Sequence, residues 1–170
     1  INGCLVGSEM CIRDSLITGV AGFLGSHLSE KLLDLGHKII GVDNMIGGYK
    51  DNIHKDIEFH NLDCSDFSKV KKIMKNIDVV YHCAATAHEG LSVFSPYEIT
   101  KNNYLASVSI FSAAVNEKVK RIIFCSSMAR YGEQQTPFTE DMIPKPVDPY
   151  GISKVAAEDV LKNLCDLNNI

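Results

Sequence analysis

The chain has 170 residues, a formal net charge of −4 and a hydrophobic fraction of 45%, which together suit a single domain with a buried core. The acidic balance argues against a broad nucleic-acid-binding surface. No apolar run reaches the roughly 18 residues that a membrane span requires, so we predict neither nucleic acid nor membrane as a partner.

Neither end of the chain looks like the end of a complete protein. The first 15 residues, INGCLVGSEMCIRDS, have no lasting hydrophobic period and no charged stretch before an apolar one, so a signal peptide is not indicated. We expect residues 1–15 to be a non-native leader and residues 16–170 to form the folded domain. The chain stops inside a helical pattern, LKNLCDLNNI, which predicts an N-terminal fragment of a longer protein.

Five short apolar runs are predicted to be β-strands. Their length and composition are those of buried strands. In chain order they are 15–19 (SLITG), 38–43 (KIIGVD), 56–63 (DIEFHNLD), 78–85 (DVVYHCAA) and 121–127 (RIIFCSS).

Segments with helical periodicity separate these runs. A helix over 23–36 ends at a glycine, and a helix over 65–76 has Ser65 or Asp66 as its predicted N-cap. A long helix is predicted from about residue 96 to residue 116. A proline-rich loop, 136–149, leads into the last helix.

Strands that are apolar on both faces and alternate with helices are typical of a parallel sheet covered on both sides. The sequence therefore predicts an α/β fold of the Rossmann type, with a doubly wound parallel sheet. Ligands bind such sheets beyond the carboxyl ends of the strands, near the point where the strand order reverses. Functional residues are thus expected just after the strands.

The stretch TGVAGFLG places Gly19, Gly22 and Gly25 directly after the first strand and at the opening of a helix. A turn this tight needs the conformational freedom of glycine, and a side chain would keep the backbone away from a pyrophosphate. The phosphates would meet free N–H groups at the positive end of the helix dipole. We predict a dinucleotide site rather than a glycine turn that binds nothing.

Asp43 ends the second strand, 18 residues after Gly25. A carboxylate there accepts hydrogen bonds from both hydroxyls of an adenosine ribose and repels a 2′-phosphate. Asn44 follows instead of an arginine, which favours NAD over NADP. Asp63, after the third strand, is either a contact to the adenine or a residue that caps a helix or forms a turn.

The stretch FCSSMARYG ends the fifth strand with Ser126 and Ser127, and Tyr150 and Lys154 lie four residues apart on one face of the last helix. An ammonium about 4 Å from a phenol, at an effective dielectric of about 20, favours its deprotonation by up to roughly 4 kcal/mol. We therefore predict that Tyr150 takes a proton from a substrate hydroxyl as hydride leaves the same carbon. Ser127 would hold that oxygen, and Lys154 would also reach the cofactor ribose.

Together these motifs resemble the extended short-chain dehydrogenase/reductase superfamily, and within it the NAD-dependent nucleotide-sugar epimerase/dehydratases. The resemblance runs from about Leu16 to the end of the chain and implies NAD as the cofactor. It implies Ser127, Tyr150 and Lys154 as catalytic residues. It implies cofactor contacts for Gly19, Gly22, Phe23, Leu24, Gly25, Asp43, Asn44, Asp63, Cys64, Cys83, Ala84, Ala85, Thr86, Asn102 and Lys154.

The residues after Ser127 bear on the reaction. Related dehydratases and decarboxylases carry acidic residues there, whereas this chain has Met128 and Ala129. The resemblance thus implies a UDP-glucose 4-epimerase-like enzyme that works by transient oxidation to a 4-keto sugar. A reductase or dehydratase, and a non-catalytic NAD-binding sensor on the same fold, remain alternatives. Arg130 replaces the family's usual small apolar residue, and contact with a phosphate and simple solvation are both open.

The family's substrate domain is built largely from residues beyond the equivalent of Ile170. The resemblance therefore implies that the last strands and the sugar pocket are missing, that this chain alone is inactive, and that the full-length protein is a homodimer acting on a UDP-hexose.

The six cysteines are scattered, with no CxxC and no cluster with histidine at zinc spacing. We therefore predict a reduced chain in the cytoplasm and no metal site. His27 and His82 are predicted to be packed or locally hydrogen-bonded rather than metal ligands.

Overall fold

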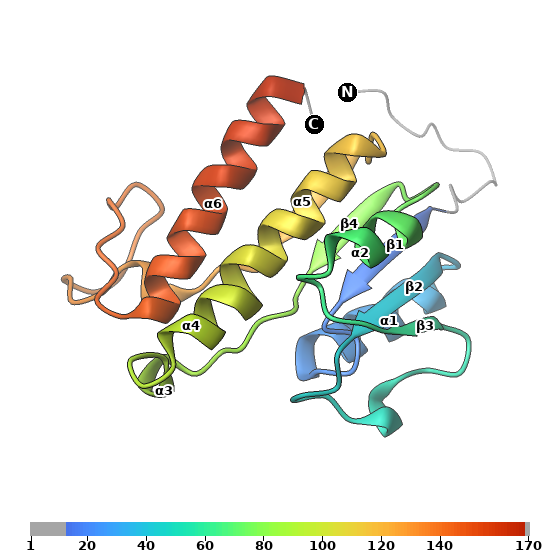
Figure 1. Ribbon diagram of the computed structural model, residues 1–170, viewed down its shortest axis with the longest axis horizontal. Helices are drawn as coiled ribbons and strands as arrows, with labels where there is room; N and C mark the ends of the chain where they lie inside the picture. Colours follow the sequence, from blue (N-terminus) through green and yellow to red (C-terminus); the bar gives the residue numbers. More distant parts are fainter. Residues whose placement is uncertain (1–12, 169–170) are drawn as a thin grey trace.

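The five predicted strands form one parallel sheet in the computed structural model, which describes residues 13–168 (Figure 1). The order across the sheet is β3-β2-β1-β4-β5, so the direction of winding reverses between β1 and β4. This arrangement confirms the predicted Rossmann-type α/β fold. The strands are β1 (Asp14–Thr18), β2 (Lys38–Asp43), β3 (Glu58–Asn61), β4 (Val79–His82) and β5 (Arg121–Phe124).

Helices cover both faces of the sheet, as Figure 1 shows. α1 lies on one face, and α2, α5 and α6 lie on the other. The longer elements are α1 (Phe23–Asp34), α2 (Phe67–Ile73), α5 (Ala106–Asn116) and α6 (Pro149–Asn168). The shorter ones are η1 (Lys50–Asn52), α3 (Glu89–Ser92), α4 (Pro96–Ile99), the π-helical η2 (Thr100–Leu105) and η3 (Met128–Arg130).

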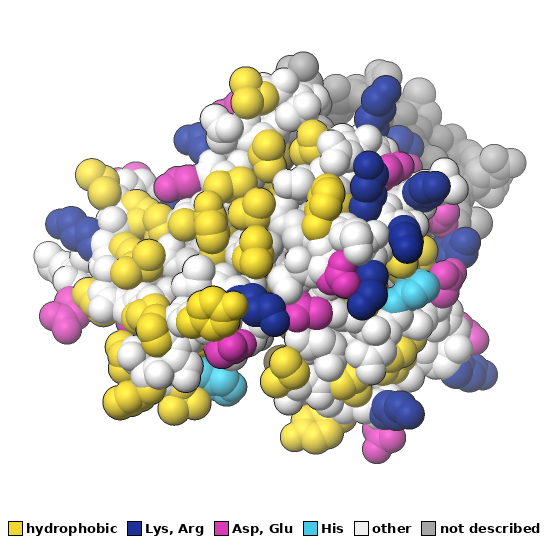
Figure 2. Space-filling model, viewed as in Figure 1, with side chains coloured by type: hydrophobic (Ala, Val, Ile, Leu, Met, Phe, Trp, Pro, Cys, Tyr) yellow, Lys and Arg dark blue, Asp and Glu magenta, His cyan; other side chains and the backbone are white. Residues whose placement is uncertain are grey.

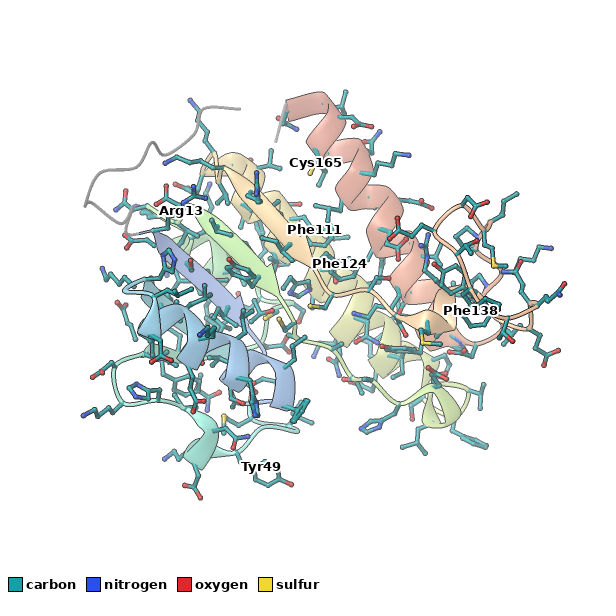
Figure 3. All side chains as sticks on the ribbon, turned by 180° about the vertical axis from the view of Figure 1, so that it is seen from behind. Arg13, Tyr49, Phe111, Phe124, Phe138 and Cys165 are labelled. Carbon is teal, nitrogen blue, oxygen red and sulfur yellow. The ribbon has the colours of Figure 1, made fainter. Side chains whose placement is uncertain are left out.

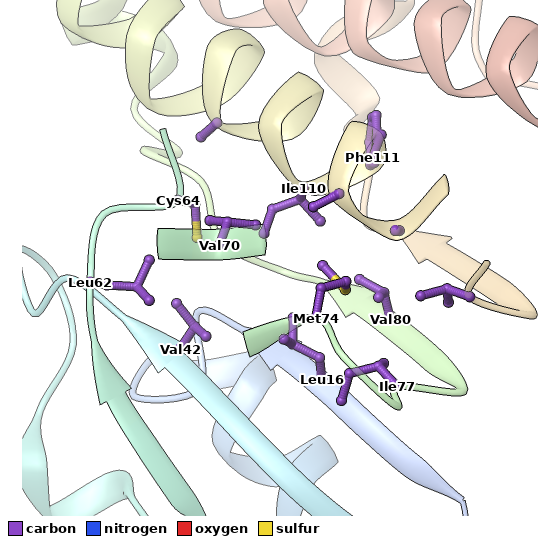
Figure 4. Packing of buried hydrophobic residues seen from close by; sticks show 14 of the residues in the cluster. Leu16, Val42, Leu62, Cys64, Val70, Met74, Ile77, Val80, Ile110 and Phe111 are labelled. Carbon is purple, nitrogen blue, oxygen red and sulfur yellow. The ribbon is translucent and has the colours of Figure 1, made fainter. Parts of the chain in front are cut away.

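The two faces carry separate hydrophobic clusters because successive side chains of a strand point in opposite directions. Leu16 packs with Val70, Ile110 and Phe111 under α2 and α5 (Figure 4). Its neighbour Ile17 belongs to the smaller cluster under α1. Both side chains are fully buried, so β1 is the central strand of the core.

Most predicted elements are present. β1 and β2 have the predicted lengths, whereas β3, β4 and β5 are shorter than the apolar runs suggested. Asp66 is the N-cap of α2, and its carboxylate accepts a hydrogen bond from the Lys69 N–H at 3.2 Å. The helix predicted over 96–116 is divided by the π-helical turn of η2. β1 begins at Asp14, two residues before the predicted domain start.

The predicted leader falls mainly on residues 1–12, which lie outside the described residues. Within residues 13–168, no helix has both the length and the apolar character needed to cross a membrane.

An aromatic cluster joins β4 and β5 to α5. The rings of Phe111 and Phe124, labelled in Figure 3, meet edge to face with centroids 5.4 Å apart. The imidazole of His82 packs against both rings, at 5.6 and 5.7 Å between centroids. These contacts fix the ends of the two strands that lead into the candidate site.

Candidate functional site

The glycine turn after β1 forms a cradle in which backbone atoms leave no room for side chains. Gly19 has a φ of +71°, a conformation that other residues rarely adopt. A Cβ atom on Gly25 would lie 2.1 Å from the Gly19 carbonyl oxygen, so no side chain fits there. Gly22 is the N-cap of α1 and offers no side-chain hydrogen bond, which leaves the first N–H groups of the 12-residue helix available to an anion.

A cavity of about 330 Å³ opens at the carboxyl ends of β1, β2 and β4. Every residue predicted to contact the cofactor lines it except Lys154. They are Gly19, Gly22, Phe23, Leu24, Gly25, Asp43, Asn44, Asp63, Cys64, Cys83, Ala84, Ala85, Thr86 and Asn102. Leu62, His88 and Ala106 also line it and were not predicted. Apolar or isolated residues of this kind carry no sequence motif, so only the folded structure identifies them.

Backbone hydrogen bonds hold the Asp43 carboxylate in the wall of the cavity. Its carboxylate accepts hydrogen bonds from the Ala21 N–H at 3.1 Å and the Met45 N–H at 2.8 Å. The side chain is only 9% exposed. Each carboxylate oxygen keeps acceptor capacity beyond these bonds, so the group can still receive hydroxyl donors.

Asp63 and Cys64 line the same cavity but differ in their surroundings. Asp63 accepts a hydrogen bond from the Ser65 N–H at 2.8 Å, and its carboxylate lies 3.3 Å from the Lys101 ammonium. Partial burial works to raise the pKa of Asp63, but the bonds from Ser65 and Lys101 outweigh it and lower that pKa. Burial raises the pKa of the Cys64 thiol to about 12. Asp63 is thus an ionised turn residue that also faces the cavity.

A directional chain of hydrogen bonds supports the wall of the cavity at β4. The Ser107 hydroxyl donates to the Asn103 carbonyl at 2.5 Å, so its oxygen accepts the N–H of His82 Nε2 at 2.9 Å. Nδ1 of His82 then accepts from the Thr18 hydroxyl at 2.7 Å, and the Thr18 oxygen accepts from the Ala84 N–H at 3.1 Å. Burial, and then the charge of Lys154, lower the pKa of His82 to about 3. The prediction that His82 is packed and hydrogen-bonded is confirmed.

Two asparagines of the π-helical turn hold the far end of this wall. The Asn103 amide accepts from the Thr86 N–H at 2.7 Å and donates to the Thr86 carbonyl at 3.2 Å. Asn102 donates to the Thr86 hydroxyl at 3.3 Å. π-helical turns occur often at functional sites, and this one brings two consecutive amides to one backbone segment.

Tyr150 and Lys154 lie in the first turns of α6, and both are buried, at 6% and 3% exposed. The Lys154 ammonium donates to the Cys125 carbonyl at 2.8 Å and lies 4.6 Å from the centroid of the Phe124 ring. Burial lowers the pKa of Lys154 to about 8, against the opposing effect of Cys125, Cys83 and Glu158. The Lys154 ammonium is therefore held at the end of β5 by the Cys125 carbonyl, and burial disfavours its charged form.

Ser127 lies two residues beyond that carbonyl and caps the η3 turn. Its hydroxyl oxygen accepts a hydrogen bond from the Ala129 N–H at 3.1 Å, and η3 packs against α6. The fold thus brings the Ser127 turn, Tyr150 and Lys154 to one place at the end of β5. None of the three is among the described residues that line the cavity.

Arg130 and Glu158 form an ion pair that the sequence did not predict. One guanidinium nitrogen of Arg130 lies 2.9 Å from the Glu158 carboxylate, and each side chain is about three-quarters buried. The Ser126 hydroxyl also hydrogen-bonds to Glu158. Arg130 is therefore neither solvated nor free for a phosphate here. The available signal was Glu158 itself, four residues after Lys154 and so on the same helix face.

Side chains that could ligate a metal ion are scattered over the described residues. Across residues 13–168, no group of three or more His, Cys, Asp or Glu side chains is placed to hold a metal ion. His27 is exposed, and its Nδ1 lies 2.8 Å from the Phe23 carbonyl oxygen, which agrees with the predicted local hydrogen bond.

Comparison with known proteins places these features in a family. Residues 15–170 match the family model described as the NAD dependent epimerase/dehydratase family. The UDP-glucose 4-epimerase of Yersinia enterocolitica is 35% identical over 159 residues, which cover 87% of this chain and 47% of that protein.

Solved structures agree with the sequence match. The Thermotoga maritima UDP-glucose 4-epimerase with UDP-glucose has a TM-score of 0.89 at 32% identity, covering 92% of this chain and 52% of that one. The Thermus thermophilus UDP-glucose 4-epimerase in complex with NAD has a TM-score of 0.88 at 31% identity, with the same coverage. The chain spans about half the length of the relatives that it matches. It belongs to the NAD-dependent epimerase/dehydratase family, as its motifs predicted.

Proposed function

We propose that the protein is an NAD-dependent nucleotide-sugar epimerase that inverts the 4-hydroxyl configuration of a UDP-hexose. The observation that carries the proposal is the buried Tyr150–Lys154 face at the end of β5, beside a glycine-lined cavity at the switch point of the sheet. The similarity to UDP-glucose 4-epimerases supports the choice of reaction.

The residues of the cavity fit NAD. The missing Cβ at Gly25 and the uncapped start of α1 suit a pyrophosphate. The Asp43 carboxylate suits the two hydroxyls of an adenosine ribose and disfavours a 2′-phosphate. We assign the pyrophosphate to Gly19, Gly22, Phe23, Leu24 and Gly25. We assign the adenosine to Asp43, Asn44, Asp63 and Cys64, and the β4 wall to Cys83, Ala84, Ala85, Thr86 and Asn102.

The proton chemistry is assigned to residues of β5 and α6. When bound, NAD would accept a hydride from the sugar carbon, leaving a ketone, and return it to the opposite face. Tyr150 takes the proton of the 4-hydroxyl and gives it back in the reverse step. The Lys154 ammonium stabilises the resulting phenolate, and burial of both groups strengthens that interaction because little water screens it. Ser127 donates a hydrogen bond to the sugar oxygen.

The full-length protein provides the test. Incubated with UDP-galactose and no added NADH, it should form UDP-glucose, while a Tyr150→Phe variant should retain bound NAD and lose at least about 100-fold in rate. Bound NAD without any interconversion would favour the sensor. In a parallel assay with added NADH, stoichiometric consumption of NADH would favour the reductase.

We also propose how the rest of the protein is organised. Residues 16–170 would form the NAD-binding half, the sugar would be held largely by residues that follow, and the 170-residue chain alone would bind NAD without turnover. Hydrophobic side chains gather over α5 and α6 in Figure 2. Exposed Leu105, at the end of η2 next to α5, and exposed Ile152 on α6 support a homodimer. Sedimentation of the full-length protein tests this. The cytoplasmic location stays a prediction.

A further inference from the structure

Two cysteines meet at the carboxyl ends of neighbouring parallel strands. Cys83 and Cys125 directly follow the register pair of His82 and Phe124, and the Cys125 N–H donates to the His82 carbonyl at 3.1 Å. Their sulfur atoms are 3.6 Å apart. The pair is thus fixed by the sheet itself rather than by flexible loops.

The pair lies between the cavity and the base of α6. Cys83 lines the cavity, and the Cys125 carbonyl holds the Lys154 ammonium. Both cysteines are partly exposed, whereas Cys64 is 7% exposed within the core cluster. Cys64 also lines the cavity, so a small reagent that enters it meets both cysteines, of which Cys83 is the more exposed and has the Cys125 sulfur 3.6 Å away.

The surroundings of the two thiols shift their pKa values in opposite directions. The hydrogen bond with Cys83, and then the Lys154 ammonium, lower the pKa of the Cys125 thiol to about 6 against the opposing effect of burial. The same hydrogen bond raises the pKa of the Cys83 thiol. A thiolate is the reactive form in disulfide exchange, so Cys125 is the attacking group.

We propose that Cys83 and Cys125 form a dithiol site that a small organic disulfide oxidises, linking the ends of β4 and β5 beside Lys154. The Cys125 thiolate attacks one sulfur of the external disulfide, forms a mixed disulfide and releases one thiolate. Cys83 then loses its proton to solvent and attacks the Cys125 sulfur, releasing the second thiolate. The two protein thiols are oxidised by two electrons, and the external disulfide is reduced to two thiols.

The backbone accommodates this bond with little movement. A disulfide has sulfur atoms about 2.05 Å apart, so the two sulfurs must approach by about 1.5 Å from their present separation. Neighbouring strands are about 4.8 Å apart, which lies within the range of Cα separations that disulfides span. Resting on the proposed function, we further expect bound NAD to cover Cys83 and slow the oxidation.

The test is disulfide mapping of the 170-residue chain. The reduced chain is incubated with oxidised glutathione with and without saturating NAD, the remaining thiols are alkylated, and the protein is digested with trypsin without reductant. Cys83 lies in peptide 76–101 and Cys125 in peptide 122–130. We expect these two peptides to be linked as the main oxidised product, and we expect NAD to slow the linkage several-fold.

Variants separate this site from general thiol reactivity. Cys125→Ser should abolish the linkage, whereas Cys165→Ser, which removes a thiol on α6, should leave it unchanged. If Cys125→Ser does not fold, one equivalent of phenylarsine oxide on the wild-type chain should protect both peptides from alkylation. Glutathione adducts on separate peptides, without the 76–101 to 122–130 link, would overturn the dithiol site. Linkage at the same rate with and without NAD would leave the dithiol site standing and count against the proposed cofactor site.

Discussion

Acidification should destabilise the fold through His82, because the folded chain keeps this imidazole neutral. Its two ring nitrogens are committed to Ser107 and Thr18, and Thr18 already accepts the Ala84 N–H. Protonation of the ring would place an N–H on Nδ1, which faces the Thr18 hydroxyl oxygen. The hydroxyl hydrogen of Thr18 would then have no acceptor. Burial and the charge of Lys154 act in the same direction and hold the pKa of His82 at about 3.

The size and sign of this effect follow from proton linkage. The unfolded chain takes up a proton on His82 near pH 6.5, whereas the folded chain takes it up only near pH 3. The free energy of unfolding is therefore unaffected above pH 6.5 and decreases as the pH falls below it. Between pH 7 and pH 5 the loss amounts to about 2 kcal/mol.

Guanidinium unfolding of the 170-residue chain at pH 7, 6 and 5 measures the loss. The His82→Gln variant should be less stable at pH 7 but should lack this part of the pH dependence. His54→Gln, which removes a partly exposed histidine, serves as the matched control and should follow the wild type. Equal pH dependence in wild type and His82→Gln would refute the reasoning, as would an imidazole proton resonance of His82 that titrates near pH 6.5.

Three further experiments have defined expectations. Gly25→Ala drives a Cβ into the backbone of the cradle and should weaken NAD binding, measured by calorimetry, at least about tenfold; Gly90→Ala, whose Cβ meets nothing within 4 Å and which does not line the cavity, should bind NAD normally. Asp43→Asn removes the charge that disfavours a 2′-phosphate, so the ratio of NAD to NADP affinity should fall, and an unchanged ratio would contradict the assignment. The double-mutant cycle of Arg130→Gln and Glu158→Gln should give a coupling energy of about 1 kcal/mol in urea unfolding, and additive effects would show that the ion pair contributes nothing.

The cofactor cradle could be predicted because its signal is local. The three glycines and Asp43 lie at fixed distances along the chain after β1 and β2, and a parallel sheet brings the carboxyl ends of those strands together. The four-residue spacing of Tyr150 and Lys154 placed both on one helix face. For such features, the spacing along the chain is enough to predict which residues lie close together in the fold.

Features that join distant segments could not be predicted in this way. Cys83 and Cys125 meet because β4 and β5 are neighbours in a particular register, and no spacing along the chain expresses that register. Arg130 finds Glu158 only once η3 has packed against α6. The π-helical turn is likewise not visible in the helical periodicity, and its Asn103 bonds to Thr86 through a contact that only tertiary packing creates.

The contacts between α6 and the end of β5 are completed by the protein alone. Lys154 bonds to the Cys125 carbonyl, and Glu158 bonds to Ser126 and Arg130 on either side of Ser127. Folding therefore bears the entropic cost of orienting the proposed catalytic side chains before any ligand arrives. NAD would therefore enter a preorganised site. Its free energy of binding would not be reduced by the cost of ordering the catalytic side chains.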